Sequence, residues 1–345
     1  MTVTAEQALS NLRDAGLCEV LYFPGQEKYN DRVSSHWSLT AQLRPWAIVQ
    51  PRNTDEVAKA VKAIVTAPDV KFAVRSGGHM QWAGASSIVD GITIDLRLMN
   101  NTSYNAETEI VSLQPGGYWG ASYKELEKYQ VVNFEVVLAD GRIINANNGE
   151  YPDLFLALKG GGNNFGIVTR FDMVTFPARD IRNSTITCHK QTSAQVSKAL
   201  VDFTKNLTTY PDDHLLAIIC QPLPASVRAR SIERGGNMLG LDHIQDDCIQ
   251  LVWAVEVETA ELNDTVSAPL LKKAVGEIEA YARSIDGSSG FLYLNYCDST
   301  QDPLSAYGEE NLRKMKDVSA TYDPEGVFQR TVPGGVQDLE TWVCD

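Results

Sequence analysis

The spacing of hydrophobic residues predicts alternating short strands and helices in the first half of the chain. Residues 46–50 form an apolar run that is typical of a buried strand, and residues 71–75 form another. Between them, Asn53 with Glu56 three positions later is typical of a helix N-terminus, and apolar residues on one helical face follow. This strand–helix–strand order indicates an α/β arrangement in this part of the chain.

The same spacing predicts elements further along the chain. Asp140-Gly141 separates two apolar runs and predicts a β-hairpin between residues 133–138 and 142–144. Other strands are predicted at 167–171, at 109–113 and at 87–96, where two short strands bend at Asp90-Gly91. Helices are predicted at 5–17, 119–129, 152–159, 268–282 and about 308–319.

Two adjacent glycines, Gly77 and Gly78, follow the strand at 71–75, and His79 stands where the turn ends. Glycine adopts backbone conformations that are closed to other residues, and it lets another group approach the main chain. Successive N–H groups in such a turn can bind an anion such as a diphosphate. On these residues alone, a tight turn with a surface histidine explains the pattern better than a cofactor loop does.

A second glycine-rich stretch, residues 160–166, joins the helix that begins at Pro152 to the strand at 167–171. A helix end needs about one glycine, so four glycines in seven residues exceed what chain reversal requires. Close packing of this backbone on another group is indicated. Tight crossing of the helix and the strand stays open as the alternative.

Composition narrows the classes of function. Of the 345 residues, 43% are hydrophobic, and the net charge of −14 is spread along the chain. This charge argues against nucleic acid or a membrane as the main partner. The N-terminus lacks a secretory pattern, so we expect a cytoplasmic protein. The six cysteines show no metal-ligand spacing, so no metal site is expected, and we expect surface or hydrogen-bonded histidines at 36, 189, 214 and 243.

Five motifs occur in an order that resembles a known family. They are V-R-S-G-G-H (74–79), V-L-A-D-G-R-I (137–143), P-D-L-F-x-A-L-K-G-G-G-x-N-F-G-I-V-T (152–169), Y-L-N-Y (293–296) and Y-D-P-E-G-V-F (322–328). Each motif alone is weak, whereas five in this order are specific. The chain resembles a berberine-bridge-enzyme-like FAD-linked oxidoreductase of the vanillyl-alcohol-oxidase (PCMH-type) flavoprotein superfamily.

The resemblance implies an α+β, two-lobed PCMH-type FAD-binding fold with an antiparallel-sheet substrate lobe. The implied parts are an N-terminal extension at 1–40, an FAD-binding domain at 41–178, a substrate lobe at 179–300, and a C-terminal segment at 301–345 that returns to the FAD-binding lobe.

The resemblance also implies a cofactor and a site. The cofactor would be FAD, with His79 as the candidate covalent tether to the flavin 8α-methyl group. The implied FAD-binding residues are Arg75, Ser76, Gly77, Gly78, His79, Gly162, Gly166, Ile167 and Val168. A strand at 290–296 would present the implied catalytic residues, Tyr293, Asn295 and Tyr296. We therefore expect an oxidase for a small secondary metabolite, in which the flavin accepts a hydride and O2 reoxidises it.

The chain departs from the family pattern after the helix predicted at 119–129. There, family members carry a long segment with another glycine-rich flavin loop and a cysteine that forms a second covalent bond. In this chain, residues 127–130 lead directly into 131–134. The substrate lobe also looks shortened between 219 and 235. The expectation is therefore a single tether at His79, without bicovalent attachment.

Two alternatives stay open, because the lost loop removes donors that would offset desolvation of FAD. One is a flavin-free cyclase or isomerase that uses acid–base chemistry in the old substrate cleft. The other is a family-derived binding protein without activity. A flavin absorbance band of the purified protein distinguishes the oxidase from both.

Overall fold

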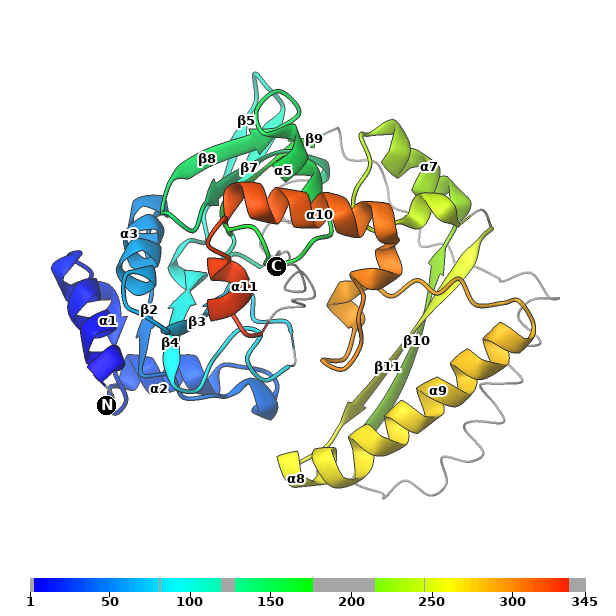
Figure 1. Cartoon of the computed structure of the whole chain (residues 1–345), viewed down its shortest axis with the longest axis horizontal. Helices are drawn as coiled ribbons and strands as arrows, with labels where there is room; N and C mark the ends of the chain where they lie inside the picture. The colour runs from blue at the N-terminus through cyan, green and yellow to red at the C-terminus, as the bar shows by residue number, and fades with distance from the viewer. Residues whose placement is uncertain (1–2, 81, 119–127, 176–214, 245, 335–345) are drawn as a thin grey trace, which may run out of the picture. The chain divides into compact units, whose positions relative to one another are not determined.

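The computed structural model describes residues 3–80, 82–118, 128–175, 215–244 and 246–334. The chain divides into two compact units (Figure 1). The first comprises the described parts of 1–178, 231–241 and 292–345, and the second those of 179–230 and 242–291. Helices together with one mixed sheet and two antiparallel sheets among the described residues make an α+β fold, as predicted.

A four-stranded sheet forms the N-terminal part of the first unit. Its order is β1 (Leu21–Tyr22), β2 (Ala47–Val49), β4 (Gly91–Asp95) and β3 (Lys71–Arg75). β2 and β3 both run parallel to β4, whereas β1 is antiparallel to β2. The strands predicted at 46–50 and 71–75 are confirmed. The stretch 87–96 forms one strand rather than two, because Asp90 adopts a φ of 56° directly before Gly91.

Three helices accompany this sheet: α1 (Val3–Asp14), α2 (Glu27–Ser34) and α3 (Thr54–Val65). The predicted start of α3 is confirmed, since the Asn53 side chain accepts a hydrogen bond from the Glu56 N–H and the Glu56 carboxylate accepts one from the Arg52 N–H. α1 packs against α3 (Figure 1). The core beneath them includes the fully buried side chains of Val57, Val61, Ile64, Phe72, Ile92 and Ile94.

A five-stranded antiparallel sheet follows in the same unit. Its order is β5 (Thr102–Asn105), β6 (Ile110–Leu113), β9 (Ile167–Thr175), β7 (Lys128–Val137) and β8 (Ile143–Asn147). The predicted Asp-Gly hairpin is confirmed, because Val137 pairs with Ile143. Most of the helix predicted at 119–129, namely residues 119–127, lies outside the described residues. Its proposed end is wrong, since Lys128 already pairs with Thr175 in the sheet.

Helices from the middle and the end of the chain complete the first unit. α10 (Glu309–Tyr322) packs against α5 (Pro152–Ala157), and α11 (Val327–Thr331) packs against β3. The Tyr322 hydroxyl donates to Asp153 Oδ1 at 2.8 Å, which ties α10 to α5. Short 3-10 turns lie at Cys18–Val20, Leu39–Ala41, Leu96–Leu98, Leu241–His243, Leu294–Tyr296 and Ser305–Tyr307.

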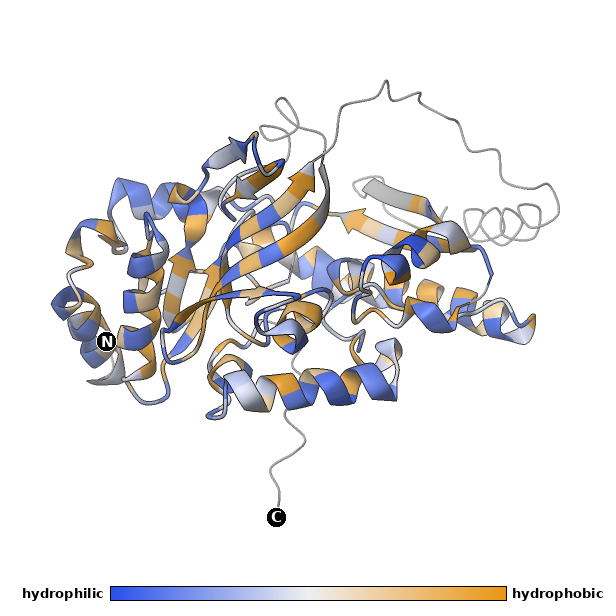
Figure 2. Cartoon of the chain, turned by 90° about the horizontal axis from the view of Figure 1, so that it is seen from above, coloured by the Kyte–Doolittle hydropathy of each residue, from blue (hydrophilic) through white to orange (hydrophobic). Residues whose placement is uncertain are grey.

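The second unit consists of a hairpin-like sheet and helices. β10 (Leu215–Leu223) pairs antiparallel with β11 (Cys248–Glu256) along its whole length. The helices are α7 (Ala225–Glu233), α8 (Ala260–Leu262), a π-helical turn (Asn263–Ser267) and α9 (Ala268–Ser284). The last residues of α7, from Ser231 on, belong to the first unit. α9 confirms the predicted amphipathic helix. Hydrophilic and hydrophobic residues alternate along the helices and strands of the chain (Figure 2). Among the described residues, none of the helices is both long and apolar enough to span a bilayer.

Candidate functional site

Two charged side chains are buried at the carboxyl ends of β3 and β4. Arg75 and Asp95 are in register there, and they are only 3% and 1% exposed. The Arg75 guanidinium donates to the Arg32 carbonyl at 2.6 Å and to the Ser35 carbonyl at 3.1 Å, while Arg32 Nε donates to Asp95 Oδ2 at 2.6 Å. Burial, reinforced by the charge of Arg32, lowers the pKa of Arg75. The C-terminal end of α2 is therefore held on the two strand ends, where its free carbonyls favour a cation.

The glycine turn begins directly after Arg75. Gly78 is buried and has a φ of 68°, and a Cβ at this position would lie 2.9 Å from Arg75 Nε. Next to Gly77 the space is open, with Tyr118 Cε1 the nearest atom at 4.0 Å from an added Cβ. Within the described chain, the main-chain N–H groups of Gly77, Gly78 and His79 have no hydrogen-bond acceptor. An anion can satisfy several such donors together.

His79 stands at the end of this turn with its side chain exposed. Its carbonyl accepts a hydrogen bond from Trp37 Nε1 at 3.0 Å, and the two rings lie 6.2 Å apart at 47°. The imidazole is thus accessible beside the free donors of the turn. The open space and the unpaired N–H groups fit the diphosphate of FAD, with an accessible imidazole beside them.

The second glycine stretch is packed against the protein itself. A Cβ on Gly166 would lie 2.6 Å from Val136 Cγ1, and one on Gly162, whose φ is 71°, would lie 3.2 Å from Leu294 Cδ1. The buried Asn164 side chain donates to the Gly161 carbonyl and accepts from Gln329 Nε2 at 3.0 Å. Close packing on β7 therefore accounts for the glycine at position 166.

The two residues after Gly166 differ in accessibility. The Ile167 side chain belongs to the hydrophobic core, whereas Val168 is half-buried. At Ile167 only the main chain is left to contact a cofactor.

The strand predicted at 290–296 is wrong. Residues Leu294–Tyr296 form a 3-10 turn, in which the Tyr296 N–H donates to the Tyr293 carbonyl and the Leu294 N–H donates to the Tyr307 hydroxyl. The turn nevertheless groups the predicted side chains. Asn295 Nδ2 donates to the Tyr293 hydroxyl at 2.9 Å, and the Tyr293 and Tyr296 rings meet edge to face at 5.0 Å.

Two contacts within the first unit join the glycine turn, the second glycine stretch and residues 293–296, called the tyrosine turn below. Trp82 Nε1 donates to the Cys297 carbonyl at 2.8 Å, which connects the segment after His79 to the tyrosine turn. Leu294 faces Gly162, which connects the second glycine stretch to the same turn. The predicted residues therefore belong to one neighbourhood of the fold.

Burial controls protonation in the tyrosine turn. It raises the pKa of Tyr293 above its usual value, and the hydrogen bond from Asn295 offsets only part of that effect. It also raises the pKa of the Cys297 thiol to about 11, and this thiol donates to the Tyr293 carbonyl. Both groups are therefore neutral at pH 7. Among the described residues, no group of histidines, cysteines and carboxylates could hold a metal ion.

Sequence motifs did not indicate Trp37, Arg32 or Asp95 as neighbours of the turn. Their contacts reach across 42 or more residues, so no local pattern contains them. The sequence offered only weak signals for Asp95 and Trp37. Asp95 stands at the end of an apolar strand, and Trp37 interrupts a polar segment.

His36 is a buried residue, so its expected surface position is wrong. It is 5% exposed, and its Nδ1 has no hydrogen-bond partner within the described chain. Burial, with the nearby charge of Arg75, lowers the pKa of His36 to about 4. The folded chain therefore holds a neutral imidazole under the end of α2.

Acidification is expected to destabilise the chain through His36. Its pKa is about 4 in the folded state, below the usual 6.5, so its contribution is complete above pH 6.5 and is lost as the pH falls towards 4. The expected loss in the free energy of unfolding is about 3 kcal/mol, because a shift of one pKa unit corresponds to about 1.4 kcal/mol. Urea unfolding at several pH values measures it. His36→Gln should flatten this slope, whereas the exposed His243→Gln should not; equal slopes in all three proteins would contradict the assignment.

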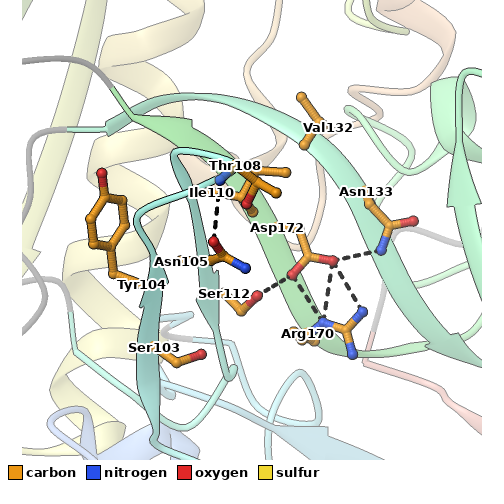
Figure 3. A pocket seen from close by; sticks show the side chains of 10 residues that line it. All are labelled: Ser103, Tyr104, Asn105, Thr108, Ile110, Ser112, Val132, Asn133, Arg170 and Asp172. Carbon is orange, nitrogen blue, oxygen red and sulfur yellow. Dashed lines mark hydrogen bonds and ion pairs between the residues drawn. The ribbon is translucent and has the colours of Figure 1, made fainter.

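The structure also contains a polar pocket on the antiparallel sheet, away from these residues. Its volume is about 300 Å³. Asp172 accepts hydrogen bonds there from Ser112, Asn133 and Arg170 (Figure 3). Arg170 also pairs with Glu135 at 2.8 Å. Because these charges satisfy one another, we assign the pocket no role in cofactor binding.

Known proteins resemble this chain in sequence and in fold. The FAD binding domain family matches residues 45–132. An FAD-dependent monooxygenase, drtC of Aspergillus calidoustus, is 27% identical, over 95% of this chain and 90% of that protein. The glucooligosaccharide oxidase of Acremonium strictum has a similar fold, with a TM-score of 0.69 and 17% identity over 96% of this chain and 99% of that one. A Physcomitrella patens BBE-like protein matches with a TM-score of 0.66 and 14% identity, over 95% and 99%.

The comparison with drtC also bears on the shortened sequence. The alignment extends over 471 positions although this chain has 345 residues, so the relative carries internal residues that are absent here. In agreement, Lys128–Val137 is one continuous strand with no loop inside it. The matched domain and these relatives agree with the predicted resemblance to FAD-linked oxidoreductases, and the solved structures show that the chain has the fold of such oxidases.

Proposed function

We propose that this chain is an oxidase that holds FAD on the turn from Arg75 to His79 and oxidises a small secondary metabolite. The observation that carries this proposal is the row of free N–H groups at Gly77, Gly78 and His79 beside an exposed imidazole. A diphosphate is a dianion, and its burial requires several donors. Bound FAD supplies hydride acceptance at N5 and reoxidation by dioxygen.

His79 is the proposed tether, through a bond from an imidazole nitrogen to the 8α carbon of the flavin. Forming this bond would replace one C–H bond of the 8α-methyl group and one imidazole N–H bond by a C–N bond. Dioxygen would accept the two released protons and two electrons, which would give hydrogen peroxide. The exposed side chain of His79 supports this role, because nothing in the described chain blocks access to it.

The tyrosine turn is the proposed place of substrate contact. Tyr293 is neutral at pH 7, so it would hold the reacting oxygen of the substrate by donating a hydrogen bond. The Asn295 amide donates to the Tyr293 oxygen and so fixes the position of the hydroxyl group. Tyr296 is 42% exposed and would offer its ring to the substrate. The monooxygenase relative and the oxidase neighbour support a small organic substrate.

A flavin spectrum of the purified full chain tests the proposal. We expect visible flavin absorbance, colour that stays in the pellet after acid precipitation, and a His79 peptide heavier by the mass of FAD. His79→Ala should release the colour into the supernatant, whereas the exposed His243→Ala should not. Colourless protein that refuses added FAD would overturn the proposal. Colour that leaves the wild-type pellet would overturn the tether alone.

A further inference from the structure

Trp37 contacts the glycine turn instead of the core. Its side chain is 64% exposed, although large aromatic residues usually bury most of their surface. Its indole N–H donates to the His79 carbonyl at 3.0 Å, and its ring lies 6.2 Å from the imidazole. This contact joins residues 42 positions apart in the sequence. Trp37 therefore restrains the residue that ends the turn.

The segment that carries Trp37 is anchored at the start of the same turn. Arg75 donates to both the carbonyl and the hydroxyl oxygen of Ser35, each at 3.1 Å, and to the carbonyl of Arg32. The pair between Arg32 and Asp95 holds this segment on β4 as well. Arg75 thus fixes Ser35, two residues before Trp37, and Trp37 in turn holds His79.

The turn between these two anchors has little restraint of its own. Gly77 and Gly78 carry no side chains, and their N–H groups have no acceptor within the described chain. Glycine also has the widest backbone freedom of any residue. The contact from Trp37 is therefore a restraint on the orientation of His79 that the turn itself does not provide.

We infer that Trp37 is a positioning residue for covalent attachment of the flavin at His79. This inference rests on the function proposed above. Bond formation requires the imidazole nitrogen to be held close to the 8α carbon in a narrow range of orientations. The hydrogen bond to the His79 carbonyl fixes the backbone from which the imidazole extends. Trp37 contacts the His79 carbonyl and none of the N–H groups of Gly77 and Gly78, so FAD binding depends mainly on groups other than Trp37.

Trp37→Phe separates these two effects, because it keeps an aromatic ring and removes the indole donor. The full chain is produced in cells starved of riboflavin and then mixed with FAD. Acid-stable flavin and the mass of the His79 peptide are followed over time, and FAD affinity is measured separately by flavin fluorescence. We expect covalent attachment to slow about tenfold, the effect of one lost hydrogen bond, at unchanged FAD affinity. Trp46→Phe is the matched control, since it removes an indole bond to Asp90 elsewhere in the unit.

Each outcome decides the inference. Attachment at the wild-type rate in Trp37→Phe would overturn it while leaving the His79 tether intact. Equal losses of affinity and attachment rate would make Trp37 a structural residue and would also overturn it. Wild-type protein that binds FAD but forms no adduct would overturn the tether and, with it, the role of Trp37.

Discussion

Replacing Gly78 with alanine is expected to lower the affinity of the chain for FAD about 100-fold. The backbone at Gly78 has a φ of 68°, where a residue with a Cβ costs about 1–2 kcal/mol. The added Cβ would also lie 2.9 Å from Nε of the buried Arg75. Relieving that overlap costs about 1–3 kcal/mol more, because Arg75 is fixed by the carbonyls of Arg32 and Ser35. The turn must therefore shift, and its N–H groups would no longer converge on one diphosphate.

Gly25→Ala separates the two causes of this loss. Gly25 has a φ of 93°, and nothing lies within 4 Å of an added Cβ, so only the backbone strain is reproduced. Titration of each variant with FAD, followed by flavin fluorescence, measures the affinity. We expect Gly25→Ala to bind as the wild type does. Equal FAD affinity of Gly78→Ala and wild type would show that this turn does not hold the cofactor.

Asp323→Ala is expected to destabilise the first unit by about 3 kcal/mol. Asp323 is 2% exposed, and its carboxylate accepts hydrogen bonds from the N–H groups of Val327 at 2.9 Å and Phe328 at 2.7 Å. Without it, two buried donors at the start of α11 lose their acceptor, at about 1–3 kcal/mol each. α11 places Phe328 against Phe72 of β3, with ring centroids 6.1 Å apart, so its loss would loosen the sheet beneath the turn.

Asp298→Ala is the matched control for Asp323→Ala. Asp298 also accepts two hydrogen bonds, from the N–H and the hydroxyl of Thr300, but it is exposed. Water replaces its side chain there, so the expected cost is below about 1 kcal/mol. Urea unfolding followed by circular dichroism compares the two variants. Similar free energies of unfolding for the two variants would mean that the hydrogen bonds of Asp323 do not stabilise the unit.

Elements set by local interactions could be predicted from the sequence. The start of α3 depends on side chains within four residues of one another. The hairpin at Asp140-Gly141 depends on a short turn in which the Gly141 N–H donates to the Leu138 carbonyl. The strand predicted around Tyr293 failed because a strand needs a neighbour, and the Leu294 N–H bonds instead to the distant Tyr307 hydroxyl. The same limit applies to His36, whose burial depends on segments far from it in sequence.

By itself, the sequence determined the order of the strands and helices and the positions of the two glycine stretches and of His79, because turn chemistry and hydrophobic spacing are local properties. Only the tertiary structure decided that Gly78 lies over the guanidinium of Arg75 and that Trp37 reaches His79. It also decided that Gly166 packs on β7. These contacts join residues that are distant in sequence, and their energies depend on burial and distance, which arise only when the strands and helices pack together.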